Sequence, residues 1–349
     1  MASSLFDIND IAGLDRVGYL FGHPISHSLS PIFHRTIFDA LDLKWSQKYL
    51  ESLDMQQFLK LTREPLFFGA SVTMPHKLAI LPHLDELTPE ARDVGACNTL
   101  FVRERNGKRI YLGTNTDVVG IKLAFYENVS SPDDTFHNRP GLVVGGGGAA
   151  RSAVYALRKF MQTTDIYIVN RDKSEVDAVI QWCTERGYGE NLVHVDTVER
   201  AHTLKGPGAI VSCVPDFPPK TREEKTARKV IELMLEKEHK GAILEMCYHP
   251  KPWTEIAGIA DKEGWQVILG TEAMIWQGLE QSRYWREEDV PVSVIDKVKG
   301  VIATELNGMR KYGLAPSSTK TPATVVTANI STHEEITPVV ESSVNIAKA

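Results

Sequence analysis

Apolar runs of strand length alternate with amphipathic stretches along the first third of the chain. Residues 17–21 and 67–72 predict strands, and the first of these reads as a buried one. Residues 31–41 predict a helix, and a further helical stretch is expected around 77–84. Because strands and helices alternate, residues 16–125 are expected to form an α/β layer.

A second α/β unit is predicted to begin at Gly141. An apolar strand leads there into a glycine-rich segment that ends at Ala150, and apolar residues at helical spacing follow. The elements expected after the glycines are a helix at 151–160 and strands at 166–169, 207–215 and 241–246. The pattern therefore predicts two α/β domains in one chain.

Three segments lie outside these elements. Residues 133–140 contain Thr, His, Asn and a final Pro, which favours a surface loop between the domains. Residues 220–238 crowd Glu and Lys together, as on the solvated face of a helix. From Pro316 onward the residues show no periodicity, and 316–349 are predicted to be a disordered tail.

Composition narrows the class of protein. A chain of 349 residues with 42% hydrophobic and 24% charged residues is long enough for two domains and has an ordinary globular composition. A net charge of −6 argues against a nucleic-acid partner, and no apolar run is long enough for a membrane span. The N-terminus does not resemble a signal peptide, and the four cysteines form no metal or disulfide pattern. A cytoplasmic protein is expected.

The glycine-rich segment predicts a dinucleotide site. Gly145-x-Gly147-x-x-Ala150 lies between a strand and a helix, the context that makes this fingerprint informative. The first glycine allows a sharp turn, the second lets the backbone approach a pyrophosphate, and the small third residue lets helix and strand pack closely. No Lys-Ser or Lys-Thr pair follows, which disfavours a nucleoside-triphosphate loop. The alternative is a glycine turn without a ligand.

The choice of dinucleotide depends on the end of the next strand. Asp172 lies about where an acidic residue commonly binds the adenosine ribose hydroxyls, whereas the neighbouring Arg171 would accommodate a 2′-phosphate. These two residues point to different cofactors, NAD and NADP.

Two hydroxyl residues, Ser28 and Ser30, follow the first strand and precede a helix that begins at Pro31. Such hydroxyls, with free backbone N–H groups, suit a carboxylate ligand. Taken alone, Ser30 is more simply a helix N-cap. A carboxylate, Asp117, ends the segment 113–117, which joins the two halves where a cleft is expected.

These segments together resemble the shikimate/quinate dehydrogenase family. The resemblance spans roughly residues 17–290 and consists of ordered motifs: Ser28-Leu-Ser30, Gly69-Ala-Ser-Val-Thr73-Met-Pro-His-Lys77, Gly95-Ala-Cys-Asn98, Asn115-Thr-Asp117, the glycine turn, Tyr248-His-Pro250, and Gly270 to Gln277. It implies an α/β protein of two domains that flank a cleft: a substrate-binding and catalytic domain at 16–125 plus 276–312, and a Rossmann-like dinucleotide-binding domain at 126–275.

The resemblance also implies the site residues. Lys77 and Asp117 would form the catalytic pair at the oxidised ring carbon, where a positioned acid–base group contributes about 10²–10⁴-fold. Substrate, quinate or shikimate, would be held by Ser28, Ser30, Thr73, Lys77, Asn98, Asp117, Tyr248 and Gln277. The dinucleotide would be held by Gly145, Gly147, Gly148, Ala149, Ala150, Asn170, Arg171, Asp172, Val214 and Gly270.

Departures from the family pattern bear on cofactor and substrate. Asp172 and Glu175 stand where NADP-type members carry a threonine and an arginine, so we expect NAD, with NADP as the alternative. Ser71 replaces a usual asparagine, and Ser212-Cys-Val-Pro215 replaces a usual Asn-Ala-Thr-Ser. A stand-alone chain that favours NAD is similar to the quinate-using members. We expect a monomer or a homodimer.

Two rival interpretations remain at this point. A non-catalytic sensor of quinate or shikimate would be expected to have lost Lys77, Asp117 or the glycine turn, and all are present. A metal enzyme is disfavoured because His23, His27 and His34 have no helical register, and we expect them to be polar loop or cap residues.

Overall fold

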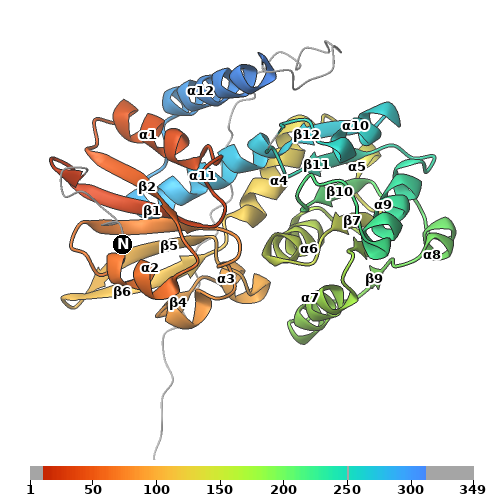
Figure 1. Ribbon diagram of the computed structural model, residues 1–349, viewed down its shortest axis with the longest axis horizontal. Coiled ribbons are helices and arrows are strands. Elements are labelled where there is room, and N and C mark those ends of the chain that lie inside the picture. Colours follow the sequence, from red (N-terminus) through yellow and green to blue (C-terminus); the bar gives the residue numbers. More distant parts are fainter. Residues whose placement is uncertain (1–10, 250, 312–349) are drawn as a thin grey trace, which may run out of the picture. The chain divides into compact units, whose positions relative to one another are not determined.

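A computed structural model describes residues 11–249 and 251–311, and these residues build two six-stranded sheets within one compact unit. Sheet A has the strand order β2-β1-β3-β5-β6-β4, and sheet B has the order β12-β11-β10-β7-β8-β9. Helices cover both sheets (Figure 1). The α/β class and the two layered halves expected from the pattern are confirmed.

Sheet A is mixed. Strands β2, β1 and β3 are parallel, whereas β5 is antiparallel to both β3 and β6. Its elements are β1 (Arg16–Gly22), α1 (Ser30–Ala40), β2 (Trp45–Glu51), α2 (Met55–Leu61), β3 (Phe67–Val72), the 3₁₀ turn η2 (Leu81–His83), β4 (Glu86–Leu87), α3 (Pro89–Val94), β5 (Thr99–Arg105) and β6 (Lys108–Thr114). One face packs on α1 and on two C-terminal helices, α11 (Gly270–Arg286) and α12 (Val292–Lys311), through a cluster rich in aromatic residues.

Every pairing in sheet B is parallel. Its elements are β7 (Gly141–Val144), α6 (Gly148–Phe160), β8 (Ile166–Val169), α7 (Lys173–Glu185), β9 (Leu192–His194), α8 (Val198–Thr203), β10 (Ala209–Ser212), α9 (Arg222–Leu235), β11 (Ala242–Glu245), α10 (Glu255–Lys262) and β12 (Gln266–Leu269). Numbered within this half, the strand order is the 3-2-1-4-5-6 of doubly wound nucleotide folds. The order reverses between β7 and β10, so a ligand crevice is expected at their carboxyl ends.

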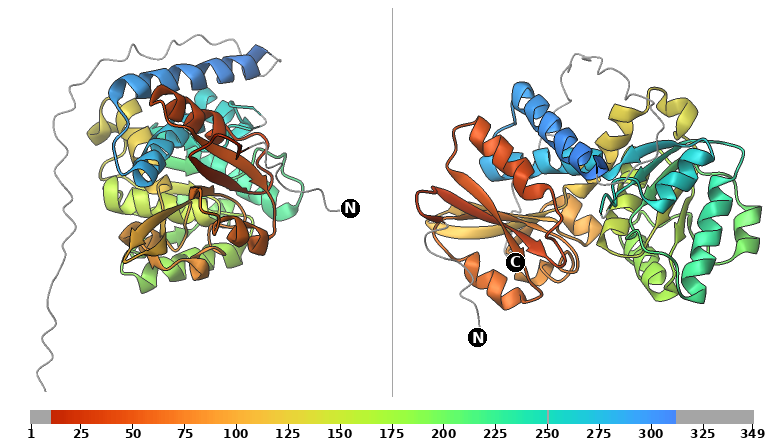
Figure 2. Two further views of the ribbon diagram at one scale, coloured as in Figure 1. Left: turned by 90° about the vertical axis from the view of Figure 1, so that its left-hand side faces the viewer. Right: turned by 45° about the horizontal axis from the view of Figure 1, so that its top comes forward.

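The chain passes between the sheets through two helices, α4 (Asp117–Asn128) and α11, which pack side by side (Figures 1 and 2). They are in close contact at Gly120, where a Cβ atom would lie 2.6 Å from the Ala273 carbonyl oxygen. Both helices begin beside the crevice, so their first turns carry side chains into it.

Two of three local expectations need correction. Residues 77–84 do not form an α-helix but a series of turns that ends in η2, because the Lys77 carbonyl accepts the N–H of Cys97 at 2.8 Å instead of a helical partner. The segment expected as a loop at 133–140 begins with one helical turn, α5 (Pro132–Thr135). The charged run at 220–238 contains the helix α9 with an exposed face, as expected, and the other side of that helix is buried through Val230, Ile231, Met234 and Leu235.

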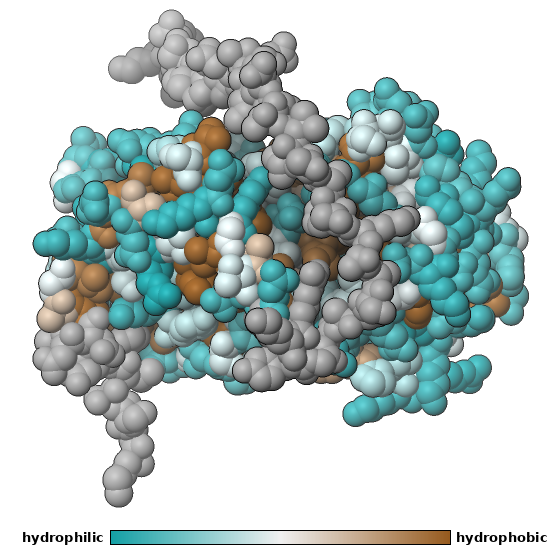
Figure 3. Space-filling view, turned by 90° about the horizontal axis from the view of Figure 1, so that it is seen from above, coloured by the Kyte–Doolittle hydropathy of each residue, from teal (hydrophilic) through white to brown (hydrophobic). Residues whose placement is uncertain are grey.

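The expected domain boundaries at 125/126 and 275/276 fall inside α4 and α11, and that division stays a prediction. The expected tail at 316–349, together with residue 312 and Pro250, lies outside the described residues. On the face shown in Figure 3, hydrophilic residues predominate and hydrophobic ones occur in small groups. No helix in the described part of the chain is long and apolar enough to cross a membrane.

Candidate active site

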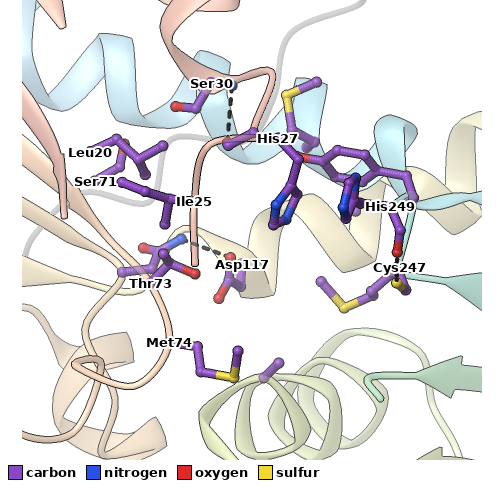
Figure 4. A pocket seen from close by; sticks show the side chains of 18 of the residues that line it. Leu20, Ile25, His27, Ser30, Ser71, Thr73, Met74, Asp117, Cys247 and His249 are labelled. Carbon is purple, nitrogen blue, oxygen red and sulfur yellow. Dashed lines mark hydrogen bonds between the residues drawn. The ribbon is translucent and has the colours of Figure 1, made fainter. Parts of the chain in front are cut away.

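A cavity of about 650 Å³ is lined by residues from both sheets and from α4 and α11, a size typical of small-molecule sites (Figure 4). All the residues expected to hold the substrate line it: Ser28, Ser30, Thr73, Lys77, Asn98, Asp117, Tyr248 and Gln277. Three of the residues expected to hold the dinucleotide, Ala149, Val214 and Gly270, line it as well. Residues far apart in sequence thus surround one space.

Lys77 and Asp117 form an ion pair at this cavity. Lys77 lies on the turns that follow β3, and Asp117 is the first residue of α4, where the positive end of the helix dipole favours a carboxylate. The Lys77 side chain is 16% exposed and that of Asp117 is 8% exposed. The pair is therefore largely shielded from water while it remains open to the cavity.

The amide of Asn98 holds Asp117 in place from the other side. Its Nδ2 donates to Asp117 Oδ1 at 2.8 Å and to Gln277 Oε1 at 3.2 Å, while its Oδ1 accepts the backbone N–H of Thr116 at 2.8 Å. One carboxylate oxygen of Asp117 thus faces Asn98 and the other faces Lys77. The arrangement brings an ammonium, a carboxylate and two amides together, which suits a ligand with several hydroxyl groups.

Ser30 does not cap α1, contrary to the simple alternative. The N-cap residue is Leu29, without a side-chain cap, and the Ser30 hydroxyl donates to Gln47 Oε1 at 2.9 Å. Ser28 precedes the helix, and its Oγ accepts the Ser30 N–H at 3.3 Å. The ring of Tyr248 comes from the sheet B side of the cavity, and burial raises the pKa of its hydroxyl.

Two histidines stack at the cavity with ring centroids 3.8 Å apart, His27 after β1 and His249 after β11 (Figure 4). Burial and the neighbouring His249 lower the pKa of His27. His34 was expected in a loop or cap but is fully buried in α1, where its Nε2 lies 3.2 Å from Gln281 Oε1. Among residues 11–249 and 251–311 no group of three potential metal ligands occurs, and the expectation of no metal stays a prediction.

The glycine turn fits a dinucleotide phosphate. Gly145 has φ +125°, a conformation that side chains rarely adopt, and it turns the chain sharply after β7. A Cβ atom on Gly147 would meet nothing within 4 Å, so the space above this residue is open. No side chain caps the 13-residue helix α6, which therefore presents unpaired N–H groups there. Open space and free donors are what a bound phosphate requires.

The end of β8 lies beside this turn, because the Gly145 N–H donates to the Val169 carbonyl at 2.8 Å. The residues that follow, Asn170 and Arg171, line a smaller hollow. Asp172 caps α7, and its Oδ1 accepts from the N–H and the hydroxyl of Ser174. Arg171 pairs with Glu224 at the start of α9. The acidic residue expected near a ribose is thus at the surface, and the neighbouring arginine already has a carboxylate partner.

Several lining residues were not singled out by the sequence patterns as site residues. They include His27, Met74, Phe217, Met246, His249 and Gln281. Gln281 carried a usable signal, because it lies four residues after Gln277 and hence on the same face of α11. Met74 and Phe217 are exposed hydrophobic residues, 55% and 70% exposed. Met74 carried a usable signal, because it lies between Thr73 and Lys77 in one of the ordered motifs.

This chain is similar in sequence and fold to shikimate and quinate dehydrogenases. Residues 20–100 match the family model described as the shikimate dehydrogenase substrate binding domain. A quinate dehydrogenase of Emericella nidulans is 45% identical over 319 residues, 86% of this chain and 97% of that protein. The structure of shikimate 5-dehydrogenase from Thermus thermophilus in complex with NADP(H) and shikimate is 28% identical, with a TM-score of 0.62 over 81% of this chain and 97% of that one. Quinate dehydrogenase from Corynebacterium glutamicum in complex with NAD, 22% identical, shares the fold with a TM-score of 0.68 over 82% of this chain and 99% of that one.

Proposed function

This chain belongs to the shikimate/quinate dehydrogenase family, and we propose that it oxidises a ring hydroxyl of quinate or shikimate, or reduces the corresponding ketone, with NAD as the favoured cofactor. The observation that carries the proposal is the Lys77–Asp117 pair in a cavity lined by hydroxyl and amide side chains. The resemblance to a quinate dehydrogenase over almost its whole length supports the same activity.

Lys77 is the group we assign to the reacting oxygen. When a secondary alcohol is oxidised, its hydroxyl must lose a proton, and the reverse reaction must return one. In the reduction, the ammonium next to that oxygen stabilises the developing negative charge and donates the proton. In the oxidation, the neutral amine accepts the hydroxyl proton, and Asp117 keeps the lysine oriented in both directions. Because Asn98 occupies the other oxygen of Asp117, the carboxylate has one defined direction in which to hold Lys77.

The remaining cavity residues are assigned to binding. Thr73, Asn98 and Gln277 present hydroxyl and amide groups that suit ring hydroxyls, and Ser28 and Tyr248 lie where the other end of a ring acid would reach. Removing such a partner leaves a buried polar group unpaired, so each is expected to affect substrate choice as well as affinity.

The dinucleotide is assigned to the glycine turn and the carboxyl end of β8. When bound, its nicotinamide ring supplies the redox chemistry by accepting or returning a hydride. Backbone N–H groups at Gly147, Gly148 and Ala149 would hold the pyrophosphate. The expectation of NAD is supported by the exposed carboxylate of Asp172 and by Arg171, whose guanidinium is engaged by Glu224. The other residues assigned to the dinucleotide are Gly145, Ala150, Asn170, Val214 and Gly270.

Initial rates with quinate and with shikimate, each with NAD and with NADP, test the activity. Lys77→Ala is expected to lower kcat by about 10²–10⁴-fold with nearly unchanged dinucleotide affinity, since the lysine acts on the proton. Lys108→Ala, a change at the exposed first residue of β6, is the control and should keep wild-type rates. If Lys77→Ala retains more than about a tenth of the wild-type kcat, the assignment of this lysine is wrong.

The same proposal covers the setting of the enzyme. We expect it to act in the cytoplasm on a small-molecule substrate, as a monomer or a homodimer, without nucleic acid or membrane. All four cysteines are free thiols, which supports a reducing compartment. Mass measurement of the purified protein gives the oligomeric state directly.

A further inference from the structure

A wall of buried polar side chains closes one end of the cavity. Ser30, Ser71 and Gln281 line the cavity, and Gln47 lies behind them on β2. Their exposed fractions are 6% for Ser30, 5% for Ser71, 1% for Gln281 and 4% for Gln47. Because buried groups of this kind are costly to leave unpaired, the direction of each hydrogen bond in the wall is strongly constrained.

The backbone carbonyl of Asn98 determines how the Gln281 side-chain amide is oriented. A carbonyl only accepts, so the Gln281 atom that lies 3.3 Å from it must be the amide nitrogen. The same nitrogen donates to Thr99 Oγ1 at 2.9 Å. The Gln281 carbonyl oxygen therefore faces the opposite way, toward Ser71 and His34.

The orientation of Gln281 then determines which atom donates in each of the next hydrogen bonds of the wall. Since Gln281 Oε1 only accepts, the Ser71 hydroxyl donates to it, at 2.9 Å. Ser71 has only one proton, so its oxygen must accept from Gln47 Nε2, at 2.8 Å. The amide oxygen of Gln47 is thereby turned to Ser30, whose hydroxyl donates to it at 2.9 Å. We call these four side chains, Ser30, Gln47, Ser71 and Gln281, the serine–glutamine relay.

His34 agrees with this assignment. Burial lowers the pKa of His34 to about 3, so the ring is neutral and carries one proton. That proton must be on Nε2, because Nε2 faces the Gln281 oxygen, which only accepts. Its Nδ1 is then a bare lone pair, and this atom has no hydrogen-bond partner among the described residues.

The relay leaves acceptors, rather than donors, facing the cavity. The hydroxyl protons of Ser30 and Ser71 are both donated to glutamine oxygens within the wall. Only lone pairs of these two hydroxyls therefore remain for a ligand in the cavity. A carboxylate, which only accepts, gains nothing from those lone pairs, whereas a ligand hydroxyl can donate to them. Ser28 lies outside the relay beside the Tyr248 hydroxyl, and its proton is not used by Gln47 or Gln281, so it can serve a carboxylate.

We infer that the serine–glutamine relay selects a ring acid with a hydroxyl on the carbon that bears the carboxylate, and hence quinate over shikimate, whose corresponding ring carbon has no hydroxyl. This inference rests on the proposed function and makes Gln47, which does not line the cavity, a positioning residue. It also departs from the expectation that Ser30 binds the substrate carboxylate.

The first test compares kcat/KM for quinate and shikimate in the wild type, in Gln47→Met and in the control Gln57→Met. Methionine fills the space of Gln47 but releases the Ser30 proton toward the cavity. The quinate-to-shikimate ratio of kcat/KM should exceed one in the wild type and fall about tenfold in Gln47→Met, roughly the effect of one buried hydrogen bond to a ligand. Gln57 lies on α2 with Ser52 as its partner, and Gln57→Met should leave the ratio unchanged.

Ser71 provides a second pair of variants in case Gln47→Met is unstable. Ser71→Ala removes the acceptor and should lower kcat/KM for quinate about tenfold with little change for shikimate, and Ser71→Thr, which keeps a hydroxyl, should restore quinate turnover. A purely structural role would lower both substrates together and would not be rescued selectively.

The failures of the two hypotheses differ. A wild-type protein that turns over neither acid with either dinucleotide contradicts the proposed function. A wild-type protein that is active but prefers shikimate, or a quinate-to-shikimate ratio that stays unchanged in both Gln47→Met and Ser71→Ala, contradicts the relay alone.

Discussion

A single buried carboxyl, Glu245, ties the end of β11 to the segment that carries Tyr248. Glu245 is 1% exposed; its Oε1 accepts the Cys247 N–H at 3.2 Å, and its Oε2 accepts the Thr254 hydroxyl at 3.0 Å. Burial raises the pKa of Glu245 to about 8, with Asp216 adding to the effect, although its hydrogen bonds act in the opposite direction. The residue is thus expected to be largely protonated at neutral pH in the folded protein.

This proton predicts a pH dependence of stability. Between the unfolded pKa of 4.5 and the folded pKa of about 8, the folded state holds a proton that the unfolded state has lost. The free energy of unfolding should therefore fall as pH rises from 5 to 8, by at most about 1.4 kcal/mol for each unit of pKa shift. Denaturant titrations at pH 5, 6, 7 and 8 measure the slope.

Glu245→Gln, which cannot ionise, should have a flatter profile than the wild type over this range. Glu238→Gln, a change at an exposed residue, is the control and should follow the wild type. Parallel profiles for wild type and Glu245→Gln would show that Glu245 is ionised in the folded state.

At the scale of elements, the start of α9 bears on the choice of dinucleotide. Thr221 and Glu224 form a capping box, in which Glu224 Oε2 accepts the N–H groups of Lys220 at 2.7 Å and Thr221 at 3.0 Å. The other oxygen of Glu224 pairs with Arg171. A helix cap therefore also places a negative charge beside the arginine that a 2′-phosphate would need.

Glu224→Gln is predicted to increase the use of NADP. Glutamine also serves in a capping box, so the helix start is kept while the charge beside Arg171 is removed. Because an exposed ion pair is weak, kcat/KM for NADP should rise only about three- to fivefold while that for NAD changes little. Steady-state kinetics with both cofactors measure the ratio.

The double variant Arg171→Ala/Glu224→Gln is the control, since without the arginine the gain should disappear. An NADP/NAD ratio that is the same in Glu224→Gln as in the wild type would exclude Glu224 as a determinant of cofactor choice.

At the scale of the molecule, α7 of the sheet B half contacts the end of α3 in the sheet A half. The carbonyl of Asp93 accepts from Trp182 Nε1 and from the Tyr188 hydroxyl, each at 2.7 Å. The Arg186 guanidinium stacks on the indole at 3.2 Å from the ring centroid. This contact is separate from the α4–α11 pair and also joins the two halves.

Gly95 permits this contact, so Gly95→Ala is predicted to destabilise the protein. Gly95 has φ +67°, and a Cβ atom there would lie 2.1 Å from the Trp182 ring, which its hydrogen bond and Arg186 hold in place. The loss should be about 1 kcal/mol for the backbone conformation and about 1–3 kcal/mol more for the overlap. Chemical denaturation of Gly95→Ala and the wild type measures the sum of these two losses.

Gly107→Ala is a matched control. Gly107 has φ +71°, but a Cβ atom there would meet nothing within 4 Å. Only the backbone cost is expected at this position. Equal losses of stability in Gly95→Ala and Gly107→Ala would mean that the Trp182 side chain accommodates the added methyl group with no further loss of stability.

The sequence alone determined what depends on local chemistry. The glycine turn at 145–150 and the strands around it were predicted, because backbone conformation and the spacing of apolar residues are local properties. The ordered motifs led to Lys77 and Asp117, and the structure places both at one cavity. The prediction of a helix at 77–84 was wrong, because the N–H of a distant residue, Cys97, donates to the Lys77 carbonyl.

Only the tertiary structure decided which distant polar groups share their protons and charges. Ser71 and Gln281 are 210 residues apart in sequence, and no local pattern marks Gln47 as their neighbour. The pairing of Arg171 with Glu224 and the burial of Glu245 are likewise long-range. Hydrogen-bond direction and desolvation depend on every group around a site, so the sequence identified the kind of site, whereas the fold decided what its hydroxyl groups offer to a ligand.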